Sequence, residues 1–109
     1  MAKYLLIESR DPFEFADADY FYGLARDLAQ RGNDLTFFLI QNGVLVARKG
    51  AQAGQLAGLQ QAGAKVLADE FSLRERGIKR DALAPAVTVS EIGALVDMLT
   101  EDGRKVVWH

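Results

Sequence analysis

Residues 33–43 read NDLTFFLIQNG, an almost unbroken apolar run that stops at a polar Gln-Asn-Gly sequence. A strand with one solvent-exposed face alternates apolar and polar side chains. A strand that is buried on both faces of a parallel sheet is apolar at nearly every position. The run 33–40 therefore predicts a strand that lies inside a parallel sheet with helices on both sides.

Four other short apolar runs, at 3–8, 64–69, 85–89 and 104–108, have the same character. Between these runs, apolar residues recur at helical spacing, which predicts helices at 18–31, 51–63 and 88–103. The loop 70–84 has room for one short helix. Strands that alternate with helices favour right-handed crossovers. We therefore predict an α/β fold, a three-layer α/β/α arrangement with a mostly parallel five-stranded sheet, in a single domain over residues 1–109.

The last predicted helix, 88–103, has the clearest apolar face, with Ile92, Leu95, Val96 and Leu99 at the i, i+3, i+4, i+7 spacing. Thr88 and Glu91 have the spacing of a capping box at its start, and Ser90 is a rival cap.

Composition excludes several classes of function. The chain of 109 residues has a formal net charge of −2, which disfavours nucleic acid as a partner. Its apolar runs are too short for a membrane span and for a secretory signal, so we expect a cytoplasmic protein without membrane attachment. It has no cysteine and one histidine, which excludes thiol nucleophiles, thiolate metal sites and multi-histidine metal sites. We assign no catalytic residue, no metal and no cofactor, and favour a protein without enzymatic activity.

Ligands of parallel α/β folds bind beyond the carboxyl ends of the strands. Seven residues at those ends form our predicted ligand-binding rim: Ser9, Arg10, Asn42, Gly43, Asp69, Ser72 and Arg76. There, Arg10 or Arg76 would clamp an anionic group, and Asp69 would act as a base or hydrogen-bond acceptor. This rim would make the protein a binder of small anionic ligands or a weak enzyme.

The Asn42-Gly43 pair has two readings. It is a plain turn, or its glycine permits a close backbone approach before a helix that starts near Val44 and offers free N–H groups to an anion. The chain contains neither GxGxxG nor a Walker A pattern, so nucleotide binding is not predicted.

Three further segments also have alternative readings. The acidic stretch 8–22 either favours a helix N-terminus or, through its five aromatic residues, docks a second subunit. The basic stretch Arg74–Arg80 is a solvated surface or meets a carboxylate surface such as residues 11–19 of a neighbouring copy. Trp108 anchors the last strand in the core or in an interface, and His109 is more often incidental than catalytic at such a position.

Two stretches, FFLIQNGVLVARKG (37–50) and GAKVLADEFSLRERGI (63–78), together with the last helix and its following strand, resemble the DsrE/DsrF/DsrH family, which includes the TusBCD sulfur-relay proteins. The likeness depends most on Asn42-Gly43-Val44 and on Arg76-Gly77-Ile78. It implies a small α/β/α domain that assembles into dimers, trimers or hexamers, and a cysteine after the third strand that carries persulfide sulfur.

The family cysteine would stand at about Asp69, and a second small residue at Ser72. Since only a thiolate forms and exchanges an S–S bond, this chain is not the sulfur carrier. The resemblance thus favours a non-catalytic, oligomer-forming accessory or scaffold subunit in sulfur-transfer or sulfur-oxidation metabolism. We expect a homo-oligomer, with sulfur-relay proteins as further candidate partners.

Overall fold

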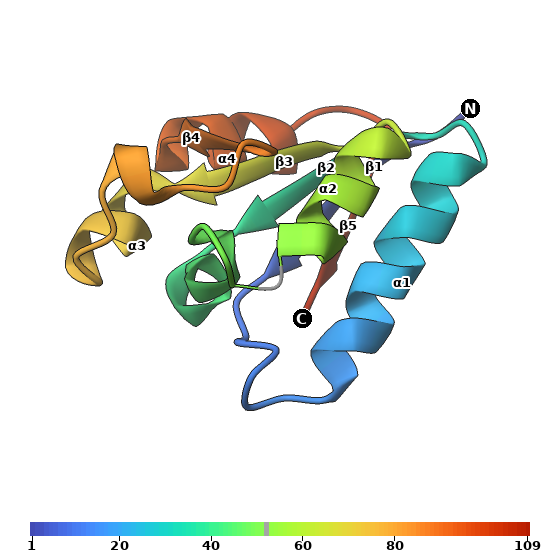
Figure 1. The fold of residues 1–109 in the computed structure, drawn as a ribbon. Coiled ribbons are helices and arrows are strands. Elements are labelled where there is room, and N and C mark those ends of the chain that lie inside the picture. The colour runs from blue at the N-terminus through green and yellow to red at the C-terminus, as the bar shows by residue number, and fades with distance from the viewer. Residues whose placement is uncertain (52) are drawn as a thin grey trace.

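The computed structural model describes residues 1–51 and 53–109 of the chain. Five strands form one sheet, and every neighbouring pair in it is parallel. The order across the sheet is β4-β3-β2-β1-β5 (Figure 1). The strands are β1 Lys3–Glu8, β2 Asp34–Leu39, β3 Lys65–Asp69, β4 Val87–Ser90 and β5 Arg104–Trp108. The predicted fold class is confirmed, and the observed sheet is parallel throughout.

Helices connect the strands and cover both faces of the sheet (Figure 1). Apolar residues of α1 and α2 pack with Leu6, Phe37 and Val66 on one face, in the larger core cluster. On the other face Leu95 of α4 packs with Leu5, Ile7 and Phe38. The helical segments are α1 Asp17–Gln30, the 3₁₀ segment η1 Gln41–Ala47, α2 Ala53–Gln61, α3 Glu70–Glu75, the 3₁₀ turn η2 Arg80–Ala82 and α4 Ile92–Leu99.

The central position of β2 in the sheet explains the apolar sequence of residues 33–40. Leu35, Phe37 and Leu39 belong to the α1–α2 side, whereas Phe38 belongs to the α4 side. All of these side chains are buried because strand residues point alternately to the two covered faces.

Three helical segments have boundaries that differ from the sequence prediction. The helical segment after β2 begins at Gln41 instead of Val44, because η1 starts directly after the strand. The last helix is Ile92–Leu99 instead of 88–103, because Thr88 and Ser90 are residues of β4. Glu91 stands at its N-cap without a side-chain hydrogen bond, so the predicted capping box is wrong. The helix predicted at 51–63 is observed as α2, which ends at Gln61 instead of residue 63, and residue 52 of the predicted helix lies outside the described residues.

The apolar face of α4 also differs from the sequence prediction. Of its four predicted apolar positions only Leu95 is buried, whereas Ile92, Val96 and Leu99 are 60%, 49% and 46% exposed. α4 is short and is the one helix in contact with its face of the sheet among the described residues, so most of its stripe remains uncovered. None of the described helices is long and apolar enough to cross a membrane.

Candidate functional site

The seven predicted rim residues fall into two groups. Asn42, Asp69, Ser72 and Arg76 lie together at the ends of β2 and β3. Ser9 and Arg10 lie beyond β1, beside Trp108 and His109 of the neighbouring β5 end. Gly43 is buried between the two groups. All seven residues therefore lie along the predicted edge of the sheet, and the structure divides that edge into two separate hollows.

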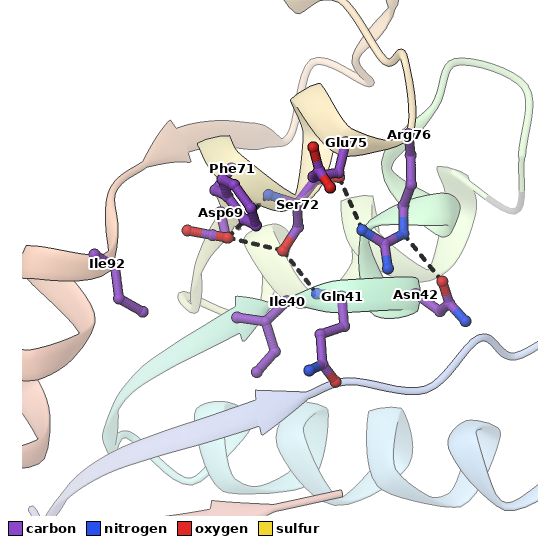
Figure 2. Close-up of a pocket in the computed structure, with 9 residues that line it drawn as sticks. All are labelled: Ile40, Gln41, Asn42, Asp69, Phe71, Ser72, Glu75, Arg76 and Ile92. Carbon is purple, nitrogen blue, oxygen red and sulfur yellow. Dashed lines mark hydrogen bonds between the residues drawn. The ribbon is translucent and has the colours of Figure 1, made fainter.

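The first hollow, which we call the Asp69 pocket, has a volume of about 630 Å³. It is bounded by the end of β2, by α3 and by the start of α4 (Figure 2). Its lining consists of Ile40, Gln41, Asn42, Asp69, Phe71, Ser72, Glu75, Arg76 and Ile92.

Asp69 and Ser72 hold one wall of the Asp69 pocket in place. Asp69 is the N-cap of α3, and its Oδ2 accepts hydrogen bonds from the Ser72 backbone N–H at 3.0 Å and from the Ser72 hydroxyl at 2.7 Å. This is the side-chain capping that an aspartate at a helix start commonly provides. The Ser72 Oγ in turn accepts the Gln41 backbone N–H at 2.8 Å, so α3 is joined to the end of β2.

Gln41 has an uncommon backbone conformation at this junction. Its φ is +52°, in the left-handed region that residues other than glycine seldom adopt. The bond from its N–H to Ser72 helps to fix this turn, which directs the chain from β2 into η1.

Arg76 closes the opposite wall. Its Nε donates to Asn42 Oδ1 at 3.0 Å, and one of its terminal nitrogens donates to the Ser72 carbonyl at 3.1 Å (Figure 2). These bonds hold a cationic group at the mouth of the pocket, and they also occupy two of the nitrogens with which it would grip an anion.

Gly43 makes the close backbone approach of its second sequence reading, whereas anion binding there stays a prediction. It is fully enclosed beside the end of β1, where a Cβ atom would overlap the carbonyl oxygen of Glu8. The pair is therefore more than a plain turn, because the glycine lets η1 approach β1 closely.

The second hollow has a volume of about 470 Å³ and is lined by Ser9, Arg10, Asp17, Trp108 and His109. The Ser9 hydroxyl donates to the His109 carbonyl at 2.9 Å and accepts the Trp108 indole N–H at 3.1 Å. Trp108 itself is 68% exposed, so it does not anchor the strand in the core.

His109 stands between two carboxylates. Its Nδ1 lies 2.9 Å from Glu8 Oε1, and its Nε2 lies 3.1 Å from Asp17 Oδ2. Its ring also stacks on Phe21, with 5.2 Å between ring centroids. His109, interpreted from the sequence as more often incidental than catalytic, is thus part of a partly buried ionic cluster.

The pKa values in this cluster shift together. Burial acts to lower the pKa of His109, but Asp17 and Glu8 more than offset it and leave that pKa above its usual value. Burial raises the pKa of Glu8, against the opposing effects of the Arg10 backbone N–H and of His109. His109 lowers the pKa of the exposed Asp17 carboxyl. The geometry therefore favours a protonated imidazole near neutral pH.

Sequence reasoning missed five residues of the Asp69 pocket: Ile40, Gln41, Phe71, Glu75 and Ile92. Gln41 alone had a usable signal, since it is the first residue after a strand. The others reach the pocket through the position of α3 and the start of α4, which residue spacing does not reveal.

The structure agrees with the helix-dipole reading of the acidic aromatic segment, and docking of a second subunit stays a prediction. Asp17 and Asp19 occupy the first turn of α1, where carboxylates favour the helix dipole. Of its aromatic residues, Phe21 and Tyr22 are buried, whereas Phe13, Phe15 and Tyr20 are 51%, 39% and 82% exposed.

The basic segment is partly neutralised within the chain. Glu70 lies 3.4 Å from Arg74 and 3.5 Å from Arg80, and all three side chains are substantially exposed. Such pairs contribute little to stability.

Comparison with known proteins identifies the family of the chain. The model of the DsrE/DsrF-like family matches residues 2–108. The chain belongs to this family, which is linked in general to sulfur relay. No curated protein matches the sequence.

Solved structures share the fold. A protein of unknown function, MTH1491 from Methanobacterium thermoautotrophicum, is 21% identical over 100% of both chains, with a TM-score of 0.84. The ychN protein from E. coli is 20% identical over 98% of this chain and 100% of its own, with a TM-score of 0.85. BT1422 from Bacteroides thetaiotaomicron is 17% identical over 98% of this chain and 95% of its own, with a TM-score of 0.77. At these identities the likeness establishes the fold.

Proposed function

We propose that this chain is a non-catalytic, oligomer-forming subunit that serves as an accessory or scaffold protein in sulfur-transfer or sulfur-oxidation metabolism. One observation carries the proposal: a broad apolar surface on the α4 side of the sheet is left uncovered. Family membership and the absence of cysteine support it.

The missing thiol argues against direct sulfur transport. A persulfide forms when a thiolate sulfur bonds to a second sulfur, and it is released by exchange at that bond. The chain has no cysteine, and the loop after β3 presents the Asp69 carboxylate and the Ser72 hydroxyl. Neither oxygen group undergoes this exchange, so contact surfaces remain as the basis of a role in sulfur metabolism.

The uncovered surface, which we call the α4–β5 face, consists of Ile92, Val96, Leu99, Val106 and Trp108. Val106 and Trp108 are in register with Leu5 and Ile7 of β1. Residues in register share a face of a sheet, so these two side chains lie on the side that carries α4. Each residue of the face is 41–68% exposed.

A second copy of the chain is the occupant that we propose. Contiguous apolar surface rimmed by polar residues is typical of protein interfaces, and tryptophan is enriched in them. β5 is also an edge strand, whose outer backbone groups are free of any strand partner among the described residues. Covering this face would bury Ile92, Val96 and Leu99, the three residues of the α4 stripe that the single chain leaves exposed.

Replacing Val96 by Asp tests the proposal, because it places a charge at the centre of the α4 stripe. We expect wild-type protein to sediment as an oligomer and Val96→Asp to sediment at a lower mass with an unchanged circular dichroism spectrum. Leu24→Asp on α1, which is 37% exposed and lies on the other side of the sheet, is the matched control and should keep the wild-type mass.

A strictly monomeric wild-type protein that binds no sulfur-relay protein would contradict the proposal. So would covalent uptake of labelled sulfane sulfur by the purified chain, because uptake would make the chain a carrier in its own right.

A further inference from the structure

The Asp69 carboxylate has one oxygen that no described residue satisfies. Asp69 is 6% exposed, and its Oδ2 accepts both bonds from Ser72. Its Oδ1 is buried and has no hydrogen-bond partner among residues 1–51 and 53–109. An unsatisfied buried acceptor is costly, and an acceptor that belongs to a carboxylate is costlier than a neutral one. This oxygen therefore requires a donor from outside the chain.

The cation beside it does not supply that donor. Arg76 directs its Nε to Asn42 and a terminal nitrogen to the Ser72 carbonyl. The Ser72 hydroxyl and backbone N–H both bond to the other oxygen of Asp69.

The lining of the pocket favours a positive ligand. Asp69 and Glu75 outnumber Arg76 in the Asp69 pocket. An adjoining hollow of about 210 Å³ shares Asp69, Phe71 and Ile92 with it, and adds the carboxylates of Glu70 and Glu91 with one further cation, Arg74. Since carboxylates are in excess in both hollows, a simple anion would meet repulsion from them and a cation attraction.

The remaining lining of the Asp69 pocket has polar residues, Gln41, Asn42 and Ser72, and apolar ones, Ile40, Phe71 and Ile92. Phe71 and Ile92 line both hollows, and so does Asp69. The Phe71 and Ile92 side chains are 59% and 60% exposed. An aromatic face attracts an organic cation in addition to its apolar contact. No group of three or more ligating side chains suited to a metal ion occurs among the described residues.

We propose that the Asp69 pocket binds a small organic amine in its protonated form, with the ammonium group donating to Asp69 Oδ1 and the carbon chain against Phe71 and Ile92. Ile92 belongs both to this pocket and to the α4–β5 face, but amine binding and assembly are measured separately, so each proposal can fail alone.

Three probes of equal length separate the chemistry: n-butylammonium, n-butanol and butyrate. In ¹⁵N–¹H spectra we expect n-butylammonium to shift the Gln41 and Ser72 amide resonances in a saturable way, n-butanol to bind more weakly and butyrate to leave them in place. Equal or tighter binding of butyrate or of n-butanol would overturn the proposal, and so would the absence of binding by n-butylammonium.

Asp69→Asn is the decisive variant. Its amide oxygen can still accept both bonds from Ser72, while its NH₂ group replaces the unpaired oxygen by a donor. Since a hydrogen bond to a charged group contributes about 1.5–3 kcal/mol, we expect n-butylammonium affinity to fall at least about tenfold. Retained affinity would overturn the assignment.

Asp81→Asn is the matched control, because it removes an equal charge from an exposed position on η2 outside the pocket. It should bind as the wild type does. If Asp69→Asn does not fold, Glu75→Gln removes an exposed carboxylate from the pocket lining, and a smaller loss of n-butylammonium affinity is expected from it. Unchanged binding in Glu75→Gln would then overturn the electrostatic argument.

Discussion

Glu8 is a fully buried carboxylate at the end of the first strand, and its environment explains how it is tolerated there. Its side chain accepts the Arg10 backbone N–H at 2.9 Å and lies 2.9 Å from His109 Nδ1. A buried carboxylate is costly unless it is hydrogen-bonded or paired with a cation. A protonated His109 supplies that cation, and Asp17 on its other side strengthens the same charge state.

This cluster predicts how stability depends on pH. A histidine whose pKa is raised by folding stabilises the protein fully below its unfolded pKa, near 6.5, and loses that contribution as pH rises through the raised value. The free energy of unfolding of the wild type should therefore fall as pH rises from about 6.5 through the raised pKa of His109, and that of His109→Gln should change less over the same range. Urea unfolding at several pH values measures both slopes.

The same prediction has a direct spectroscopic check. His109 is the one histidine in the chain, so its ring proton resonance is unambiguous in an NMR titration. A titration midpoint at or below 6.5 would contradict the proposed ionic cluster.

Single residues differ in how far the sequence revealed them. Asp69 and Ser72 were identified because they lie at the end of an apolar strand and just beyond it, a position that chain order alone determines. The role of His109 was missed because its partners are Glu8 and Asp17, which lie about a hundred positions away along the chain. Contacts of that range depend on strand order, and no local pattern encodes it.

The contact between η1 and β1 depends on one glycine. The Glu8 carbonyl accepts the Ile40 backbone N–H at 3.0 Å, and Gly43 packs against the same carbonyl. A methyl group at residue 43 would push η1 away from this junction of β1 and β2.

We therefore expect Gly43→Ala to destabilise the protein by about 1–3 kcal/mol, as overpacking of a close contact does. Gly58→Ala is the matched control, because nothing lies within 4 Å of the added methyl group there and the residue is inside α2. That variant should be more stable by about 0.5–1 kcal/mol, since alanine favours a helix over glycine. Equal effects of the two substitutions in chemical denaturation would argue against the close contact.

Strands were easier to predict than helices. All five apolar runs became strands, with bounds that differ by two residues or fewer, because burial on both faces leaves a continuous apolar run. The last helix was predicted too long because Thr88 and Ser90 suit a helix cap as well as a strand. Pairing of β4 with β3 decides that these residues are extended.

Two separate apolar surfaces remain on the described chain. One is the α4–β5 face, and the other is the exposed aromatic group of Phe13, Phe15 and Tyr20 near the start of α1. Phe15 is partly engaged, because the Arg10 guanidinium lies 4.9 Å from its ring centroid. Two such surfaces would allow an assembly that uses two kinds of contact, as tetramers of D2 symmetry do.

We predict that Phe13→Asp lowers the oligomer mass by a step different from that of Val96→Asp, and that the double variant is a folded monomer. The physical reason is that each charge is placed in a different apolar contact. Analytical ultracentrifugation measures the masses, and circular dichroism checks the fold. An unchanged mass in both Phe13→Asp and Phe15→Asp would remove the aromatic segment from the assembly.

The sequence by itself determined the layered parallel sheet, the placement of the seven candidate residues along the carboxyl ends of its strands and the lack of a sulfur-carrying thiol. These follow from residue type and order along the chain, because burial on two faces and thiol chemistry each require particular side chains. Only the tertiary structure decided that the rim divides into two hollows. It also decided that, within the part of the chain that the structure describes, one Asp69 oxygen has no partner and most of the α4 apolar stripe is uncovered. The reason is that these features depend on distances between segments far apart in sequence, which strand order and helix placement set.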